Sequence, residues 1–306
     1  MKQLYFIKTI ILPLLLLAFT PSYAQKDIDF RINLKEGMCF EVESNQLSQG
    51  SVPSGKEMIE NKSESTMVSQ YHVVKKKTGS YTINFMYKDC YIKSTGIRDF
   101  TVNPKTADML NILDASTQIA MMLDKPFAAE LSPKGKILAI KGNQAVMKEF
   151  KTKTKKLAPA LREQVYSIVN SLTGKEALVE LFENWTNYIP VSTVKIGSQW
   201  DVQKDSSITR YTFVAETDTT YVIEGVGSGK KTTRNEIQKG FVMIMSKAEE
   251  FTVTVEIDKQ TFLPKVITQE TEALLNVKSE FQNNPELSKP SVQSHVTTTL
   301  KIRSCH

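Results

Sequence analysis

Alternation of apolar and polar residues is the main pattern of this chain, and it predicts strands. Residues 251–257 alternate from Phe251 to Ile257, turn through 258–264 and return as 265–271. Because successive side chains of a strand point to opposite faces, this period of two indicates antiparallel strands with one buried and one solvated face. Further segments of this kind are 241–245, 296–302 and 127–140, the last with a turn at Ser132-Pro133-Lys134-Gly135.

A helical period separates the two strand-rich parts. Apolar residues at three- and four-residue steps predict a helix that begins near Pro159 and ends at Thr173-Gly174. A second helix is expected over 175–188, before Pro190. A third helix is expected near 104–123, after Asn103-Pro104. The first helix would bury Leu157, Leu161, Val165, Ile168 and Leu172, and the third Met109, Leu110 and Leu113.

The same series of landmarks occurs twice. Residues 34–42 align with 194–202 as apolar-Lys-x-Gly-x-x-aromatic-acid-Val, and in both parts a Tyr-x-x-Val precedes a Tyr-x-Ile at a Tyr-to-Tyr spacing of ten. A glycine permits the positive φ of a tight turn, and the aromatic residue begins a strand that faces the core. The first part would carry a 20-residue insertion near 47–63. We therefore predict duplication of a β-subdomain; chance similarity between amphipathic strands is the alternative.

Together these patterns predict an α+β protein. It would consist of two related, curved antiparallel β units, half-barrel or barrel-like, with a helical connection between them. The first unit is expected over 25–142, with its helix near 104–123; the connection covers 143–189 and the second unit 190–306. Curved sheets of this kind often enclose an apolar cavity.

The first 24 residues have the features of a secretory signal peptide. Two lysines precede an apolar core, and Ser22-Tyr23-Ala24 is a small-x-small cleavage site. An uncleaved anchor is the alternative. Cleavage would remove Lys2 and Lys8 and lower the formal charge from +6 to +4. No cysteine follows the apolar core, so we expect an exported protein of the periplasm or envelope that is not a lipoprotein and has no transmembrane helix after cleavage.

Three cysteines leave the disulfide pattern open. Cys39 and Cys90 both lie in strand-like segments, and an exported chain can form disulfides, so these two are the expected pair. Bridges from Cys39 or Cys90 to Cys305 remain alternatives, as do three reduced thiols.

Catalytic and cofactor motifs do not stand out. The three histidines lack the helical spacing of a metalloprotease site, and we expect no enzyme activity, no cofactor and no metal. A zinc site from His295, Cys305 and His306 is the less favoured alternative. Residues 225–231 superficially resemble a phosphate-binding loop, but the pattern favours a flexible loop. The pair Glu249-Glu250 is expected to be solvated.

Lysines cluster at Lys75–Lys77 and again between Lys148 and Lys156. Such clusters can attract anionic lipid headgroups or polyanions, although a solvated face is the simpler explanation. A nucleic-acid partner is not expected, because an exported chain would not meet one and the clusters lack interleaved aromatic residues.

Residues 188–200, Tyr-Ile-Pro-Val followed by Val-Lys-Ile-Gly-Ser-Gln-Trp, resemble the signature of an uncharacterised family of exported Bacteroidota proteins. Members of that family resemble this chain in the export signal, the two Lys-x-Gly-x-x-aromatic strand starts and the Ser-Pro-x-Gly-like hairpin. The resemblance implies no activity, because the family has no known function. One departure is the turn at 259–261, where a Gly is expected after Thr261.

Export, duplicated β units and missing catalytic groups favour a non-enzymatic binding module of the periplasm or envelope. Its ligand would be lipid-like or otherwise apolar, and its oligomeric state is not indicated. A structural or protein-interaction component of the envelope is the alternative. A hydrolase would require Cys39, His72 or a carboxylate pair to converge in a cleft.

Overall fold

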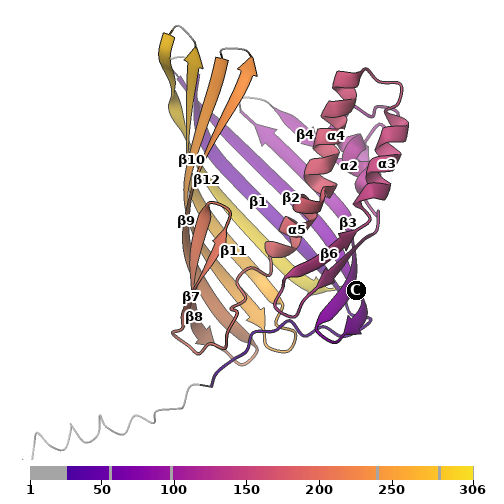
Figure 1. Ribbon diagram of the computed structural model, residues 1–306, viewed down its shortest axis with the longest axis vertical. Coiled ribbons are helices and arrows are strands. Elements are labelled where there is room, and N and C mark those ends of the chain that lie inside the picture. The colour runs from indigo at the N-terminus through magenta and orange to yellow at the C-terminus, as the bar shows by residue number, and fades with distance from the viewer. Residues whose placement is uncertain (1–25, 55–56, 97–98, 239–240, 282–283, 306) are drawn as a thin grey trace, which may run out of the picture.

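The computed structural model describes residues 26–305 except 55–56, 97–98, 239–240 and 282–283, so the expected signal peptide lies outside the described residues (Figure 1). The chain forms one antiparallel sheet in the order β6-β5-β3-β2-β1-β12-β11-β10-β9-β8-β7, with β4 paired beside β3. The strands are β1 (Cys39–Ser54), β2 (Glu57–Lys77), β3 (Ser80–Thr95), β4 (Phe100–Val102), β5 (Phe127–Leu131), β6 (Ile137–Lys141), β7 (Gln199–Lys204), β8 (Ser207–Glu216), β9 (Thr220–Gln238), β10 (Phe241–Asp258), β11 (Pro264–Phe281) and β12 (Asn284–Ser304). The helices are η1 (Pro104–Thr106), α2 (Ala115–Met122), α3 (Asn143–Lys153), α4 (Pro159–Thr173) and α5 (Lys175–Glu183).

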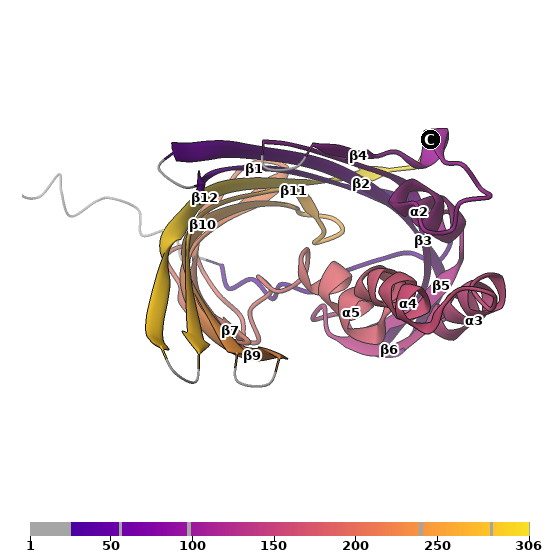
Figure 2. The same cartoon turned by 90° about the horizontal axis from the view of Figure 1, so that it is seen from above.

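The sheet is strongly curved and does not close. Seen from above, it forms an arc, and α4 and α5 lie on its concave side near the β3, β5 and β6 end (Figure 2). A curved antiparallel sheet with helices between its two strand-rich parts agrees with the sequence. These parts do not form separate sheets, because β1 pairs with β12 over Phe40–Ser51 and joins them into one.

Aromatic side chains fill the concave side at the level of α5. Phe182 of α5 and Trp185 just after it contact the ring of Tyr71 on β2 at centroid distances of 5.4 and 5.7 Å. Phe85 and Phe40 flank that ring on the neighbouring strands. All five side chains are almost fully buried, so between α5 and β1–β3 the concave side is a packed core rather than a cavity.

The segment before β1 closes the lower end of this core. Ile28 pairs with Val194, and the ring of Phe30 contacts Phe213, Tyr221 and Phe262 at 5.3–5.8 Å between centroids. The Ile32 N–H donates to the Pro133 carbonyl at 2.8 Å, so the segment contacts elements from both parts of the sheet.

The two glycine turns anticipated from the sequence have matching geometry. Gly37 and Gly197 have φ of +81° and +88°, values that favour glycine. Gly37 donates its N–H to the Val73 carbonyl at 2.8 Å, and Gly197 donates to that of Phe213 at 2.7 Å. In both hairpins the strand register shifts by one residue directly after this acceptor.

The expected turn at 132–135 is confirmed, and Gly135 takes a φ of +77° between β5 and β6. At the turn after β10 the expected glycine is replaced by Phe262, which has a φ of +55°. Its ring stacks on Tyr221 at 5.9 Å, and its carbonyl accepts the Tyr188 hydroxyl, so tertiary contacts offset the strained backbone.

The predicted bounds of the helix that begins near Pro159 are correct, and the predicted bounds of the other two helices are wrong. The helix expected over 175–188 ends at Glu183. The helix expected near 104–123 is limited to a short 3-10 turn and α2, since Asp108 and Asn111 accept the N–H groups of Leu110 and Leu113 and form turns instead. The apolar residues expected inside are consequently exposed, by 53% for Met109, 95% for Leu110 and 45% for Leu113. The stripe predicted for α4 also differs, because its buried residues are Val165, Val169 and Thr173.

Residues 225–231 are not a flexible loop; they lie inside β9. Gly225, Gly227 and Gly229 face the concave side, where side chains from neighbouring strands occupy the space above them. A Cβ on Gly227 would lie 2.3 Å from the ring of Phe251. Gly225 and Gly227 therefore let the rings of Tyr211 and Phe251 cover the strand, and Gly229 lies under the side chains of Ser207 and Glu249.

The expected Cys39–Cys90 disulfide is wrong. The structure bonds Cys39 to Cys305, an alternative that the sequence left open, and leaves Cys90 free and buried. Cys39 and Cys90 lie opposite His72 and Met67 of β2, five residues apart along that strand, which corresponds to roughly 17 Å. The pairing of β1 with β12 instead brings Cys305 to Cys39.

Candidate functional site

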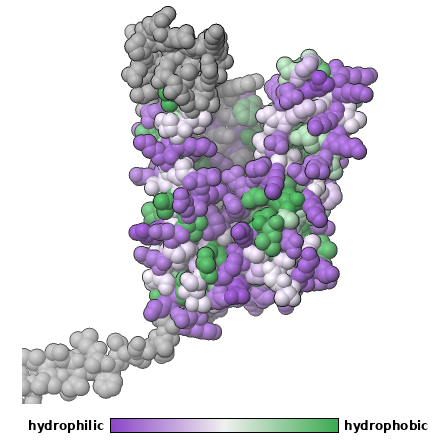
Figure 3. Space-filling view, in the orientation of Figure 1, coloured by the Kyte–Doolittle hydropathy of each residue, from purple (hydrophilic) through white to green (hydrophobic). Residues whose placement is uncertain are grey.

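A pocket of about 340 Å³ lies between α5 and the concave face of β7–β11. Its apolar floor is formed by Val202, Tyr211 and Phe251, and Asn184 and Asn187 line the side nearest α5. The space-filling view shows the hollow between the long strands and the helical part, with apolar surface inside it (Figure 3). We call this the inner pocket.

Packing behind the floor holds Tyr211 in place. Its ring stacks on Trp200 at 5.9 Å, and the Trp200 indole donates to the Tyr188 carbonyl at 3.1 Å. The Tyr211 hydroxyl donates to Asn187 Oδ1 at 3.5 Å. Burial raises the pKa of Tyr211 to about 12, so the phenol is neutral at physiological pH and contributes an uncharged surface.

Lysines gather at the mouth of the inner pocket. Lys231 of β9 and Lys247 of β10 are direct cross-strand partners that both line it. Glu249 lies 2.5 Å from Lys247, and Lys204 lies 3.7 Å from Glu180. Like charges directly opposite each other on a sheet repel. The Glu249 carboxylate offsets part of that repulsion, and a further anionic group at this mouth would offset more of it.

Above the packed core, the concave face continues as a neutral surface. The strand registers place alternate residues of β1, β2, β11 and β12 on this face, and twelve of them directly above the core are uncharged. We call them the inner trough: Ser44, Gln46, Ser48, Ser63, Ser65, Met67, Gln269, Thr271, Ala273, Ser294, Val296 and Thr298. Gln269 also lines the inner pocket, so pocket and trough are continuous.

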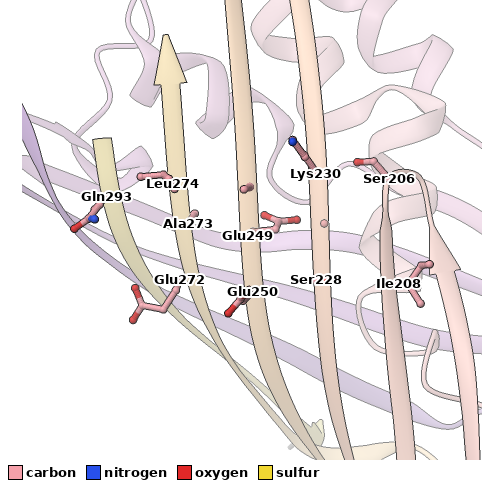
Figure 4. A pocket seen from close by; sticks show the side chains of 12 residues that line it. Ser206, Ile208, Ser228, Lys230, Glu249, Glu250, Glu272, Ala273, Leu274 and Gln293 are labelled. Carbon is pink, nitrogen blue, oxygen red and sulfur yellow. The ribbon is translucent and has the colours of Figure 1, made fainter. Parts of the chain in front are cut away.

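The convex face differs from this trough in carrying charge. An open groove of about 750 Å³ crosses β8–β12 there, and Figure 4 shows its side chains on neighbouring strands. Glu250 and Glu272 are cross-strand partners in this groove, and Glu272 is 2.7 Å from His295 Nδ1. Exposed Ile208 lies on the same face. The inner pocket is less open to solvent than this groove, and we regard it as the stronger candidate.

The residues considered for chemistry do not assemble into one centre. Cys39 lies opposite His72, but its sulfur is bonded to Cys305 and is not a free thiol. His295 is ten residues from Cys305 along an extended strand, roughly 33 Å, which contradicts the zinc hypothesis; His306 lies outside the described residues. No group of three or more potential metal ligands occurs in the described part of the chain.

The two carboxylates of the Glu249-Glu250 pair lie apart from each other, and the first lysine cluster lies at the end of another strand. Glu249 and Glu250 belong to opposite faces of β10, and Figure 4 shows their side chains diverging. Lys75, Lys76 and Lys77 are exposed at the end of β2, where Lys77 is 3.2 Å from Glu130.

The sequence did not reveal the inner pocket. Lys231 and Lys247 face it only because both segments are strands, whereas the sequence pattern favours a flexible loop over residues 225–231. Lys231 follows Gly229 and Gly227 at intervals of two residues, and Lys247 precedes Phe251 by four. If both segments are assigned as strands, this even spacing places both lysines on the face of Phe251.

Comparison with solved structures finds distant likenesses. Lipovitellin, in a structure describing lipid–protein interactions, is 12% identical with a TM-score of 0.46, over 90% of this chain and 26% of lipovitellin. The chain thus spans about a quarter of that protein. An outer membrane channel from Pseudomonas putida F1 is 7% identical (TM-score 0.21; 91% and 100% of the two chains). The translocator domain of autotransporter NalP from Neisseria meningitidis is 6% identical (TM-score 0.20; 88% and 90%).

Among curated proteins, no sequence matches. Within the described residues, every helix is too short or too polar to cross a bilayer. A family of unknown function (DUF6263) matches residues 78–264, which is more than half of the chain. The chain therefore belongs to this family of unknown function.

Proposed function

We propose that this protein is an exported, non-enzymatic binding module of the periplasm or envelope that holds an anionic, lipid-like amphiphile. The apolar chain lies along the inner trough, and the anionic end lies at Lys231 and Lys247. The observation that carries the proposal is the continuity between a neutral trough and a lysine-bearing pocket on one concave face.

The packed core limits where the ligand can lie. Phe182 and Trp185 fill the concave side between α5 and β1–β3, so the apolar chain of a ligand lies above them, between the long strands. Burying an apolar chain contributes about 0.8 kcal/mol per CH₂, and the hydroxyl-rich trough leaves part of the chain in contact with polar groups. Moderate affinity and easy release follow from this balance.

Duplication of the β units also belongs to the proposal. Each glycine turn makes the same two backbone hydrogen bonds: the glycine N–H donates to a strand carbonyl, and the N–H of that strand residue donates back to the carbonyl that follows the glycine. Both following hairpins shift register at the same place. Copying of one unit explains how residues 160 positions apart acquired the same local geometry.

Ligand binding is tested by fluorescence titration of the mature protein with dansyl-labelled undecanoate. We expect saturable binding, and we expect Lys231→Gln/Lys247→Gln to weaken it about tenfold through loss of the cationic partner. Lys62→Gln, on the exposed convex face of β2, is the control and leaves binding unchanged. A wild-type protein that binds no probe, and that carries no lipid when purified from its own host, refutes the proposal.

A protein-interaction role is the second candidate, and one observation favours it. Leu110 is 95% exposed in a loop that hydrogen bonds hold in place. An exposed, ordered apolar side chain is a common feature of protein contacts. Crosslinking in cells from position 110 is expected to capture a stoichiometric envelope protein under this alternative, and capture of none removes it.

A further inference from the structure

The connection between α3 and α4 combines a dense positive charge with an apolar tip. Residues 148–156 contain five lysines and one glutamate, a formal charge of +4. The mature chain expected after loss of residues 1–24 also has a formal net charge of +4. Basic and acidic residues are therefore equal in number in the rest of that chain. Positive charge is therefore concentrated on one projecting element.

The fold directs these lysines outward. Val146 and Phe150 of α3 are buried, and the helical repeat places Lys148 and Lys151 on the opposite side. Lys155 and Lys156 follow in the exposed turn. The carboxylate within this segment, Glu149, already contacts Lys125 at 2.8 Å and Lys153 at 3.9 Å.

Apolar residues lie directly beside the lysines. Ala158, Pro159 and Ala160 are exposed at the start of α4, and Leu161 is 38% exposed. No acidic side chain lies in the first turn of α4. Figure 3 shows weakly apolar surface at the upper end of the helical part, bordered by hydrophilic surface. We call residues 148–161 the basic tip.

We propose that the basic tip docks the protein onto the surface of an anionic lipid bilayer. Lysines beside small apolar groups match a layer of anionic headgroups above acyl chains, since charge draws the element in and the apolar residues enter the interface. The four outward lysines would contact headgroup phosphates, and Leu161 the boundary with the acyl chains. A docked tip would place the trough of the same protein close to a source of amphiphiles.

Vesicle cosedimentation of the mature protein tests this docking. We expect binding to phosphatidylglycerol–phosphatidylcholine vesicles, at least tenfold weaker binding to pure phosphatidylcholine, and a loss as salt rises. Lys148→Gln/Lys151→Gln/Lys155→Gln/Lys156→Gln is expected to bind the anionic vesicles at least tenfold more weakly. Leu161→Ser is expected to reduce binding about threefold.

The matched control removes four exposed lysines from elsewhere, as Lys35→Gln/Lys62→Gln/Lys75→Gln/Lys195→Gln. It keeps wild-type binding if the basic tip is the contact. Equal loss in both quadruple variants, binding that ignores lipid charge, or attraction to soluble heparin without attraction to vesicles overturns the proposal. Circular dichroism checks that each variant is folded. Titration with dansyl-labelled undecanoate without vesicles reports the inner pocket separately, so failure of one proposal is distinguishable from failure of the other.

Discussion

Cys39, at the start of β1, is covalently joined to Cys305, directly after the end of β12. The bond closes a sequence separation of 266 residues. Because cross-linking a long loop restricts the unfolded chain, Cys39→Ser/Cys305→Ser is expected to lower the free energy of unfolding by about 2–5 kcal/mol. Urea denaturation measures this change. Wild-type protein in reductant should unfold at the same urea concentration as the variant, and an unchanged midpoint in both would contradict the assignment.

The thiol of Cys90 should be almost unreactive in the folded protein. Burial, with a smaller contribution from the charge of Asp89, raises its pKa to about 11. Since the thiolate is the reactive form, iodoacetamide at pH 8 should label native Cys90 roughly a hundredfold more slowly than the same residue in urea. Mass spectrometry of the labelled peptide gives both rates. Rapid native labelling would show that β3 opens at this position.

Acid should destabilise the protein through Asp29. A hydrogen bond from Lys134 at 2.7 Å, aided by Arg31, holds the pKa of Asp29 below its ordinary value. Its contribution to stability is therefore present above about pH 4, the pKa in the unfolded chain, and disappears as the pH falls through the lowered pKa. Asp29→Asn should show a smaller loss of urea stability between pH 7 and pH 3 than wild type. Asp218→Asn, in the exposed turn before β9, should behave like wild type.

Gly227 should tolerate no larger side chain while Phe251 is present. A Cβ there would collide with the ring, so Gly227→Ala is expected to cost about 1–3 kcal/mol of unfolding free energy. Phe251→Leu shortens the opposing side chain and should reduce that cost in the double variant. Thermal and urea unfolding of the wild type, the two single variants and the double variant gives the coupling free energy between positions 227 and 251. Additive effects would mean that the ring and the glycine are independent.

The inner trough should be blocked by a large side chain at Ala273. This residue lies on the concave face between Glu249 and Ser294 in the strand register. Ala273→Phe is expected to abolish saturable binding of dansyl-labelled undecanoate with little loss of stability. Leu274→Phe is the control, because successive side chains of a strand point to opposite faces and Leu274 therefore points to the convex side. Equal binding by both variants would place the ligand elsewhere.

Local patterns in the sequence identified much of this fold. The alternation from Phe251 to Ile257, the turn at Gly135 and the helix that begins at Pro159 depend on neighbours in the chain, and all three predictions are confirmed. The wrong predictions have two causes: side chains that compete for backbone hydrogen bonds, and contacts with residues far away in the sequence. Asp108 and Asn111 bind backbone groups that a helix would otherwise use.

Long-range contacts explain the remaining differences. The loop predicted over 225–231 is wrong because the side chains that cover its glycines come from other strands. The predicted Cys39–Cys90 pair is wrong because the disulfide depends on the pairing of β1 with β12. The inner pocket depends on the same information, since Lys231 and Lys247 meet only when β9 pairs with β10.

The order of the strands also has a consequence for how the chain folds. Most neighbouring strands are consecutive in sequence and can form as hairpins. The exception that joins the two halves of the sheet is β1, which pairs with β12 at the other end of the sequence. Loop closure over that separation is entropically costly and slow. We therefore expect the hairpins on either side of the β1–β12 pair to form early and the β1–β12 pairing to form late. The backbone amides that join β1 to β12 should be the last to gain protection from hydrogen exchange.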